Sequence, residues 1–201
     1  RSLNIDFILG LVKKILQIRS AFKLVISSAT INTNTFSRYF NNCPIVKIKT
    51  HSHPVEVIYK PFIPENDPKK LISAITKIFM NINKSDTSGD VLIFLSGERD
   101  IRECLKRLSD ALGATNWMLL PLFGRLSKSE QLRVFKVYKN YRKIIVATNI
   151  AETSITIPGI KYVIDSGKAK INSYNTKSFT ASLTEEAISM SSCNQRKGRA
   201  G

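Results

Sequence analysis

Two short stretches of this sequence gather side chains that bind phosphate groups. The first, residues 148–156, reads TNIAETSIT and directly follows the apolar run at 143–147. Ligands of open α/β sheets bind at the carboxyl ends of strands, where a helix start also offers unpaired backbone N–H groups to an anion. The second stretch, residues 195–201, reads QRKGRAG. Arginines in such a setting bind phosphate through paired hydrogen bonds and can stabilise the charge of phosphoryl transfer.

The two stretches resemble two helicase motifs. Residues 147–156 are similar to motif V of superfamily 2 helicases, and residues 195–201 are similar to motif VI, which has the form QRxGRxGR. Together with YVIDSG at 162–167 they resemble the DEAH-box ATP-dependent RNA helicases. The variants IPGIK at 157–161 and QRKG at 195–198 look most like the bacterial HrpA branch, and the resemblance covers essentially the whole chain.

The resemblance implies a site for ATP with Mg²⁺, of which this chain supplies one wall. Gln195 would help to position the attacking water, Arg199 would act as an arginine finger on the γ-phosphate, and Thr156 would lie near the ribose or the phosphates. Many relatives carry Asp where this chain has Pro158, so a ribose contact is not expected there. Without the resemblance, residues 195–199 are also compatible with a basic surface turn.

Phe135 matches a family position at which an aromatic ring stacks on the nucleotide base. Stacking needs no hydrogen-bond code and would give weak base selectivity. The residue pattern leaves a second interpretation open. Phe135 follows Leu132 by helical spacing, so both side chains could simply pack in the core.

The resemblance also implies contacts with RNA, mainly with the backbone of a single strand. The residues concerned follow predicted strands, and they are Ser96, Gly97, Arg125, Thr148 and Asn149. Hydroxyl, amide and backbone N–H groups hold phosphates without reading sequence, so affinity would fall steeply with salt. Ser96 and Gly97 are equally compatible with a simple helix start.

Ser28 and Thr30 belong to the tripeptide SAT, which resembles motif III and would couple the nucleotide cleft to the RNA track. Read alone, these two residues also fit a helix cap. Arg1 to Asp6 resembles the segment that directly follows a DEAH box. The chain is therefore expected to begin just after the carboxylates that bind magnesium.

Neither a GxxxxGK[ST] loop nor a DEAH box occurs in the sequence. The groups that cradle the phosphates and bind Mg²⁺ are thus expected outside this chain, which should not hydrolyse ATP by itself. The partner implied is the first RecA-like lobe of a longer protein. The alternatives are a non-catalytic helicase-like lobe that binds nucleic acid or protein, and a basic DNA-binding protein that uses no nucleotide.

Composition sets the remaining bounds. The 201 residues carry a formal net charge of +16, which favours a polyanionic partner such as nucleic acid over a merely solubilising surface. Cys43, Cys104 and Cys193 are scattered and form no CxxC pair, which fits reduced thiols in a cytoplasmic protein and no metal site. The sequence has no apolar run long enough for a membrane span.

Three regions are expected along the chain. Residues 1–43 are interpreted as the C-terminal part of a first RecA-like domain, and residues 44–53 as a linker. Residues 54–201 are interpreted as a second RecA-like domain, of the helicase C-terminal type, cut at motif VI. Strands are expected at 23–27, 45–49, 55–59, 91–95, 118–123, 143–147 and 161–165.

The fold class expected is α/β. Helices are expected over 3–18, with the apolar residues on one stripe, and over 31–40. Further helices are expected from Pro68 to about Ile82 with Asp67 as the cap, through Ile101 to Leu112, and after a capping box of Ser127 and Glu130, where the last helix carries Leu132, Phe135 and Tyr138. Their alternation with apolar strands predicts a RecA-like, mostly parallel sheet with helices on both faces. Polar alternation at 168–174 and 179–183 predicts a β-hairpin that projects from this sheet.

Overall fold

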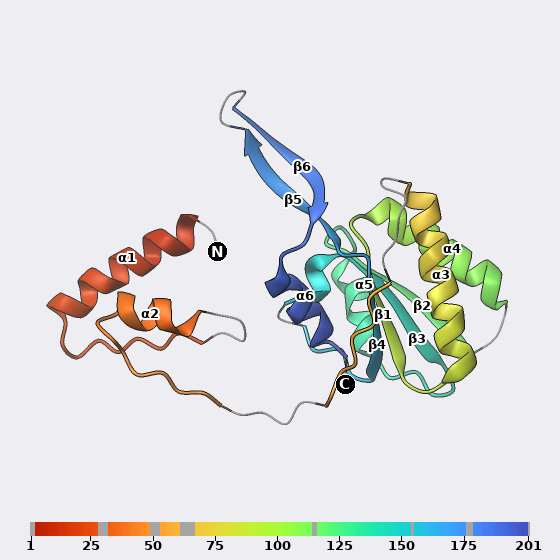
Figure 1. Ribbon diagram of the computed structural model, residues 1–201, viewed down its shortest axis with the longest axis horizontal. Coiled ribbons are helices and arrows are strands. Elements are labelled where there is room, and N and C mark those ends of the chain that lie inside the picture. Colours follow the sequence, from red (N-terminus) through yellow and green to blue (C-terminus); the bar gives the residue numbers. More distant parts are fainter. Residues whose placement is uncertain are drawn as a thin grey trace. The chain divides into compact units, whose positions relative to one another are not determined.

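The computed structural model describes residues 3–27, 32–48, 53–60, 67–113, 116–153, 155–175 and 179–200. The chain forms two compact units, Arg1–His51 and Ser52–Gly201 (Figure 1). Ser28 and Thr30, the motif III residues, lie outside the described residues. None of the described helices is both long and apolar enough to cross a membrane.

The first unit contains α1 (Leu3–Ile18) and α2 (Thr33–Tyr39). The Asn32 side chain caps α2 by accepting a hydrogen bond of 3.2 Å from the Thr35 amide. The predicted apolar stripe of α1 forms but is not buried, since Leu3 is 84% exposed and Phe7 is 73% exposed. The helix therefore has an apolar face without a partner among the described residues.

Three predicted strands are not present in the structure. Residues 23–27, 45–48 and 55–59 are described, and none of them belongs to a strand. Their apolar, β-branched composition is typical of strands, but a strand exists only where a neighbouring strand supplies the ladder of hydrogen bonds. No such neighbour pairs with these segments in the described part of the chain.

The second unit is built on a parallel sheet, as predicted. Its strands are β1 (Asp90–Phe94), β2 (Trp117–Leu122), β3 (Arg142–Ala147) and β4 (Ile160–Asp165), in the order β2-β3-β1-β4. In the centre, β1 pairs with β3 and with β4 in parallel register. The two central strands, β1 and β3, are almost fully buried, because protein covers the sheet on both faces.

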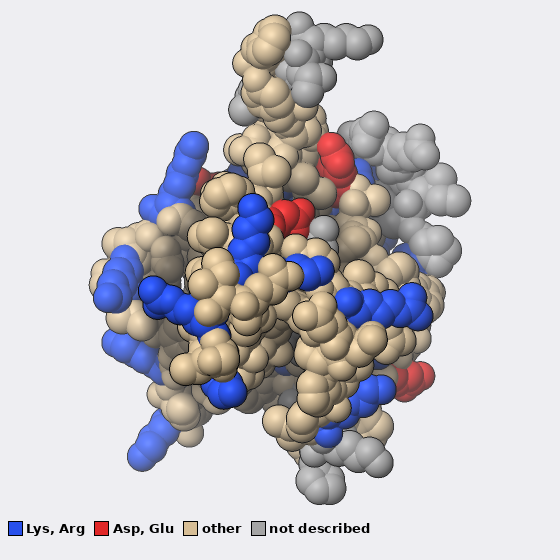
Figure 2. All heavy atoms as spheres, turned by 90° about the vertical axis from the view of Figure 1, so that its left-hand side faces the viewer, with Lys and Arg blue, Asp and Glu red and all other residues tan. Residues whose placement is uncertain are grey.

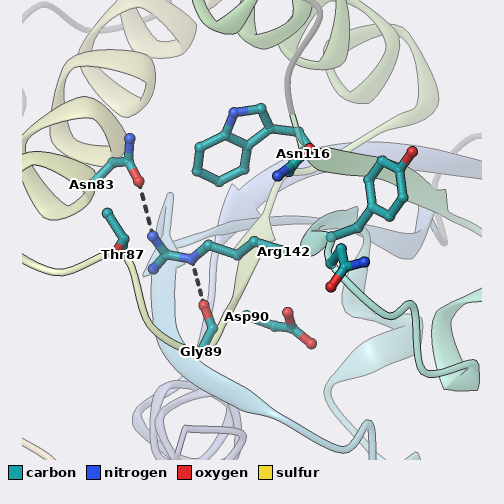
Figure 3. Close-up of a pocket in the computed structure, with 9 residues that line it drawn as sticks. Asn83, Thr87, Gly89, Asp90, Asn116 and Arg142 are labelled. Atoms are coloured by element: carbon teal, nitrogen blue, oxygen red, sulfur yellow. Dashed lines mark hydrogen bonds between the residues drawn. The ribbon is translucent and has the colours of Figure 1, made fainter.

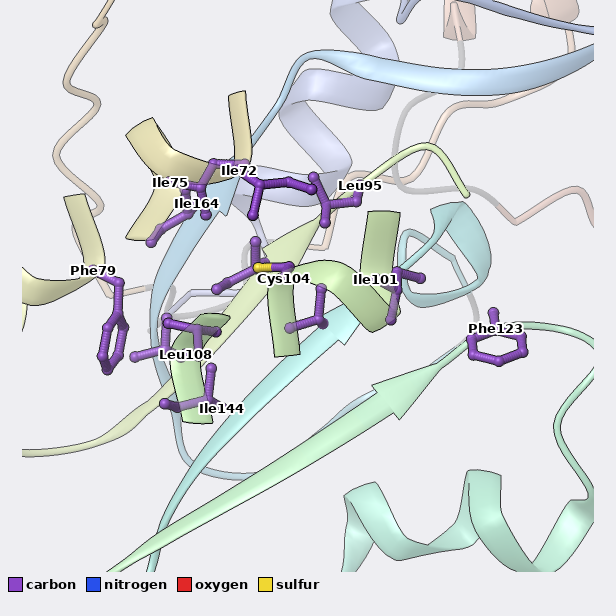
Figure 4. Packing of buried hydrophobic residues seen from close by; sticks show 13 residues of the cluster. Ile72, Ile75, Phe79, Leu95, Ile101, Cys104, Leu108, Phe123, Ile144 and Ile164 are labelled. Atoms are coloured by element: carbon purple, nitrogen blue, oxygen red, sulfur yellow. The ribbon is translucent and has the colours of Figure 1, made fainter. Parts of the chain in front are cut away.

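Two long helices cover one face of the sheet, namely α3 (Pro68–Ser85) and α4 (Glu98–Leu112). Asp67 caps α3 by accepting hydrogen bonds from the Lys69 and Lys70 amides, and Pro68 occupies the first turn, as the sequence predicts. Figure 4 shows the core beneath these helices, which includes Ile72, Ile75, Phe79, Ile101, Cys104, Leu108, Ile144 and Ile164. Burial raises the pKa of the Cys104 thiol to about 12.

Shorter elements cover the opposite face. They are α5 (Lys128–Leu132), the 3-10 turn η1 (Arg133–Phe135) and the 3-10 turn η2 (Asn149–Ala151). The capping box predicted at Ser127 and Glu130 is present, with reciprocal bonds of 2.9 and 3.3 Å. The sequence predicts that this helix extends to Tyr138, but it ends at Leu132. The chain there tightens into η1, whose Val134 is buried in the core.

An antiparallel hairpin follows β4, formed by β5 (Lys168–Asn175) and β6 (Thr180–Ala187). In Figure 1 it extends away from the sheet, as predicted. Tyr174, Phe179 and Leu183 are exposed on it. The chain then forms α6 (Met190–Lys197), whose first turn is capped by Ser189 at 3.2 Å from the Ser192 amide.

Phe79→Ala should lower the free energy of unfolding by about 3–5 kcal/mol, because the ring is fully buried and leaves a cavity when it is removed. The ring also contacts Trp117 edge to face, with centroids 5.7 Å apart. Urea denaturation followed by circular dichroism measures the change. Val137→Ala is the control, since that side chain is 81% exposed. Equal stability of the two variants would contradict this core.

Candidate functional site

The carboxyl ends of the four parallel strands lie at one edge of the sheet. Backbone bonds extend the strands past their ends, from Leu95 to Ala147 at 2.9 Å, from Thr148 to Leu122 at 3.0 Å and from Ser166 to Phe94 at 3.2 Å. The residues predicted to contact RNA follow these ends, with Arg125 after β2, Ser96 and Gly97 after β1, and Thr148 and Asn149 after β3. The fold thus brings together residues that are far apart in the sequence.

The loop after β3 is open at this edge. Thr148 is half-buried, and its hydroxyl caps η2 by accepting a hydrogen bond of 3.5 Å from the Ile150 amide. Asn149 is exposed, as is Arg125 in the turn after β2. An amide and a guanidinium therefore face solvent beside a capped turn, which is a suitable arrangement for phosphate oxygens.

Ser96 has a different environment from the one expected. It is buried, and its hydroxyl lies within hydrogen-bond distance of two carboxylates, Asp100 at 3.2 Å and Glu185 of β6. The Ser96 hydroxyl and then Lys168, at 3.1 Å, hold the pKa of the Glu185 carboxyl below its usual range. In this structure the Ser96 side chain joins the hairpin to the end of β1 instead of facing solvent.

Gly97 is buried beside the same hairpin. A Cβ atom at Gly97 would lie 3.1 Å from the end of the Lys170 side chain of β5, so the glycine allows the hairpin to approach closely. The base of the hairpin thus covers part of the strand-end edge, whereas the end of β3 stays accessible.

Arg196 of α6 is the central buried charge of the site, with 1% of its surface exposed. Its Nε donates to Glu152 at 3.0 Å, and its Nη1 donates to Asp165 at 2.7 Å and to the Lys168 carbonyl at 3.3 Å. Its guanidinium also lies over the Phe94 ring, 4.7 Å from the centroid. One side chain therefore connects motif VI to motif V, to the end of β4 and to the start of the hairpin.

Arg199, three residues further on, has a different set of partners. It is half-buried, its Nε donates to the Gln195 carbonyl at 3.4 Å, and its Nη1 donates to the Ile155 carbonyl. No carboxylate forms an ion pair with it within the described ranges. Its positive charge is thus held by carbonyl dipoles alone, next to the half-buried Gln195, whereas the charge of Arg196 is balanced by two carboxylates.

The two remaining nucleotide candidates are both accessible. Phe135 ends η1 with its side chain 38% exposed, while the preceding Val134 is fully buried. Thr156 is exposed in the segment between η2 and β4. The Phe135 ring belongs to neither of the core clusters formed by the described residues.

Sequence reasoning missed Lys143, Asp90 and Glu185 as residues that shape the site. Lys143 is buried at the start of β3, where its ammonium pairs with Asp90 at 3.2 Å. A lysine at the head of an otherwise apolar buried strand was the available signal, because lysine is rarely buried without a partner. Glu185 left no such signal, since its contact with Ser96 spans 89 positions of the chain.

A cavity of about 510 Å³ lies at the opposite edge, around the amino ends of β1, β2 and β3. Figure 3 shows the Arg142 guanidinium there, bonded to Asn83 at 3.0 Å and to the Gly89 carbonyl. None of the predicted site residues lines this cavity. In the part of the chain that the structure describes, no group of three or more His, Cys, Asp or Glu is placed to hold a metal ion.

Comparison with known proteins identifies the class. Residues 70–201 match the family model described as the helicase conserved C-terminal domain, and the chain belongs to that family. A solved structure, described as the "Crystal structure of E. coli DExH-box NTPase HrpB", aligns with a TM-score of 0.85 and 32% identity, over 100% of this chain and 24% of that chain. The second unit is thus a RecA-like helicase domain.

Within this class the chain is similar to the HrpA type of DEAH-box helicase. It is 54% identical over 202 residues to the "ATP-dependent RNA helicase HrpA" of Borreliella burgdorferi, covering 100% of this chain and 24% of that protein. It is 47% identical over 203 residues to the protein of the same name from Escherichia coli, covering 100% and 15%. The chain thus spans a quarter or less of the length of these relatives.

Arg196→Met should lower the free energy of unfolding by about 3 kcal/mol, because it leaves Glu152 and Asp165 with unpaired, largely buried charges. Lys70→Met is the control, since it removes an exposed ion pair with Asp67 worth less than about 1 kcal/mol. Chemical denaturation measures both variants. A loss for Arg196→Met no greater than that of the control would show that the network does not stabilise the fold.

Proposed function

We propose that this chain is part of an ATP-dependent RNA helicase that couples ATP hydrolysis between two RecA-like lobes to translocation on RNA or its unwinding. Residues 54–201 are the second lobe, residues 44–53 are a linker, and residues 1–43 complete the first lobe. The family match and the names of the relatives support this proposal. We place the protein in the cytoplasm, in keeping with its scattered thiols.

One observation carries the proposal, namely the contrast between the two arginines of motif VI. Arg196 is neutralised by Glu152 and Asp165, so it has no net charge to offer a ligand. Among the described residues, Arg199 is bonded only to carbonyl groups. A guanidinium without a carboxylate partner gains most from meeting a phosphate, because the charged pair replaces two neutral contacts. Arg199 is therefore the arginine finger of the proposal.

The other residues proposed for the nucleotide site come from separate segments of the domain. Gln195 lies one turn before Arg199, on the helix that Arg196 holds in place, and positions the attacking water. Phe135 stacks on the base, and Thr156 contacts the ribose or phosphates. The ligands of Mg²⁺ and the phosphate-binding loop are supplied by the first lobe, because this sequence contains neither motif.

RNA binds along the strand-end edge through its backbone. Thr148, Asn149 and Arg125 are placed there with accessible polar groups. On the face shown in Figure 2, lysine and arginine side chains are spread over the surface and acidic ones are few, in keeping with the net charge of +16. Ser96 and Gly97 join this contact if the hairpin base moves, because Glu185 now holds the Ser96 hydroxyl.

An exposed apolar face of the first unit is evidence that this unit belongs to a larger lobe. The exposed stripe of α1, with Leu3 and Phe7, has the pattern of a helix that packs against a sheet. We propose that further protein of the first lobe covers it. Ser28 and Thr30 then couple this lobe to the RNA track, as their resemblance to motif III implies.

Arg199→Ala tests the finger role in the full-length helicase to which we propose that this chain belongs. Loss of an arginine finger should lower kcat for ATP hydrolysis by about 1,000-fold. RNA affinity without nucleotide should stay unchanged. Arg99→Ala, an exposed arginine of α4, is the matched control and should hydrolyse ATP normally. Normal turnover of Arg199→Ala would refute the role, and absence of ATPase from the unmutated protein would favour a non-catalytic lobe.

Thr148→Ala combined with Asn149→Ala should weaken RNA binding equally for all sequences. The salt slope of the affinity should not change, because neither side chain is charged, whereas Arg125→Ala should reduce that slope by about one. Fluorescence anisotropy with single-stranded RNAs of different sequence measures both quantities. Thr87→Ala with Asn116→Ala, at the opposite edge, is the matched control. A sequence-selective loss would contradict backbone binding.

A further inference from the structure

Lys143 places a buried ammonium group between two segments that the proposed nucleotide site uses. The residue is 3% exposed at the start of β3. Its Nζ donates to the Val134 carbonyl at 3.2 Å and to the Pro158 carbonyl at 3.2 Å, and it pairs with Asp90 at 3.2 Å. One cation thus holds together three backbone segments that are distant in the sequence.

The two carbonyl groups lie next to the residues proposed to contact the nucleotide. Val134 directly precedes Phe135, and Pro158 follows Thr156 by two residues. Neither segment belongs to a long helix or to the sheet, since Phe135 ends a 3-10 turn and Thr156 lies in irregular chain. Apolar contacts of Val134 and Ile157 fix each segment to the sheet. Lys143 adds a directed bond that connects the two segments to each other.

Asp90 fixes the position of the ammonium group from the other side. Its Oδ1 accepts a hydrogen bond of 2.8 Å from the Lys143 amide, and its own amide donates to the Gly159 carbonyl at 2.8 Å. Gly159 has φ +88°, and a Cβ atom there would lie 3.0 Å from the Asp90 carboxylate. The turn at 158–159 is therefore shaped to fit this ion pair.

We propose that Lys143 is a positioning residue for ATP, which sets the spacing between the base contact at Phe135 and the ribose or phosphate contact at Thr156. The inference rests on the proposed function of this chain. A buried ion pair is weak evidence for stability alone, because apolar residues of similar size often stabilise a core as well. The two carbonyl bonds give the lysine a task that an apolar side chain cannot perform.

Lys143→Met in the full-length helicase tests this role, because methionine is only one atom shorter than lysine and lacks the hydrogen-bond donors. The KM for ATP should rise about tenfold, which corresponds to about 1.4 kcal/mol of binding free energy. The kcat at saturating ATP should stay within about threefold, because Arg199 and Gln195 are not moved. An unchanged KM in a folded variant would overturn the proposal.

Combination with Phe135→Ala separates positioning from a general loss of stability. If Lys143 acts through the spacing of the two contacts, its removal should add little to the KM once the base contact is gone. If Lys143→Met raised the KM as much in the Phe135→Ala background as it does alone, the proposal would be overturned. Should Lys143→Met fold poorly, the double variant Lys143→Met with Asp90→Asn removes both buried charges and serves in the same comparison.

A control completes the experiment. Lys161→Met breaks an exposed pair with Asp86 at 2.7 Å and should leave the KM unchanged. A rise in KM for this control equal to that of Lys143→Met would overturn the positioning role. Failure of the proposed function itself would appear separately, as absence of ATPase in the unmutated protein.

Discussion

The buried guanidinium of Arg196 is the interaction on which the arrangement of this domain depends. Motif V, the end of β4, the start of the hairpin and α6 are separate in the sequence, yet each supplies a partner to this one side chain or carries it. A charge with 1% exposure is tolerated only because two carboxylates balance it. Each of these segments is therefore constrained to one position relative to the others.

The two arginines of motif VI therefore differ in their partners. Because two carboxylates of the domain neutralise its charge, Arg196 holds α6 in place. Gln195 lies on this helix, and Arg199 follows the end of the helix by two residues. In the part of the chain that the structure describes, the charge of Arg199 is met only by carbonyl dipoles. The same network reaches the hairpin through the Lys168 carbonyl, and Glu185 connects the hairpin to Ser96. The residues proposed to contact the nucleotide and the base of the hairpin are thus connected through one network.

The sequence predicts the parts of this fold that local pattern determines. The parallel sheet, the cap of α3 at Asp67 and the capping box at Ser127 follow from apolar runs and cap residues, and all are present. Pairing between segments that are distant in the sequence cannot be predicted from the local residue pattern of either segment. Strands predicted at 23–27 and 55–59 have no partner in the described chain, and the contact of Ser96 with Glu185 joins residues 89 positions apart. The motif residues were found by resemblance, whereas their supporting partners were found only in the structure.

The most direct measurement is a crystal structure of the full-length helicase with Mg²⁺, ADP and a planar fluoride mimic of the transferred phosphate. The account predicts that Arg199 leaves the Ile155 carbonyl and donates to the fluoride, while Arg196 keeps its bonds to Glu152 and Asp165. If Arg199 stays on the Ile155 carbonyl with the mimic bound and the lobes closed, or if Arg196 moves in its place, the account is contradicted.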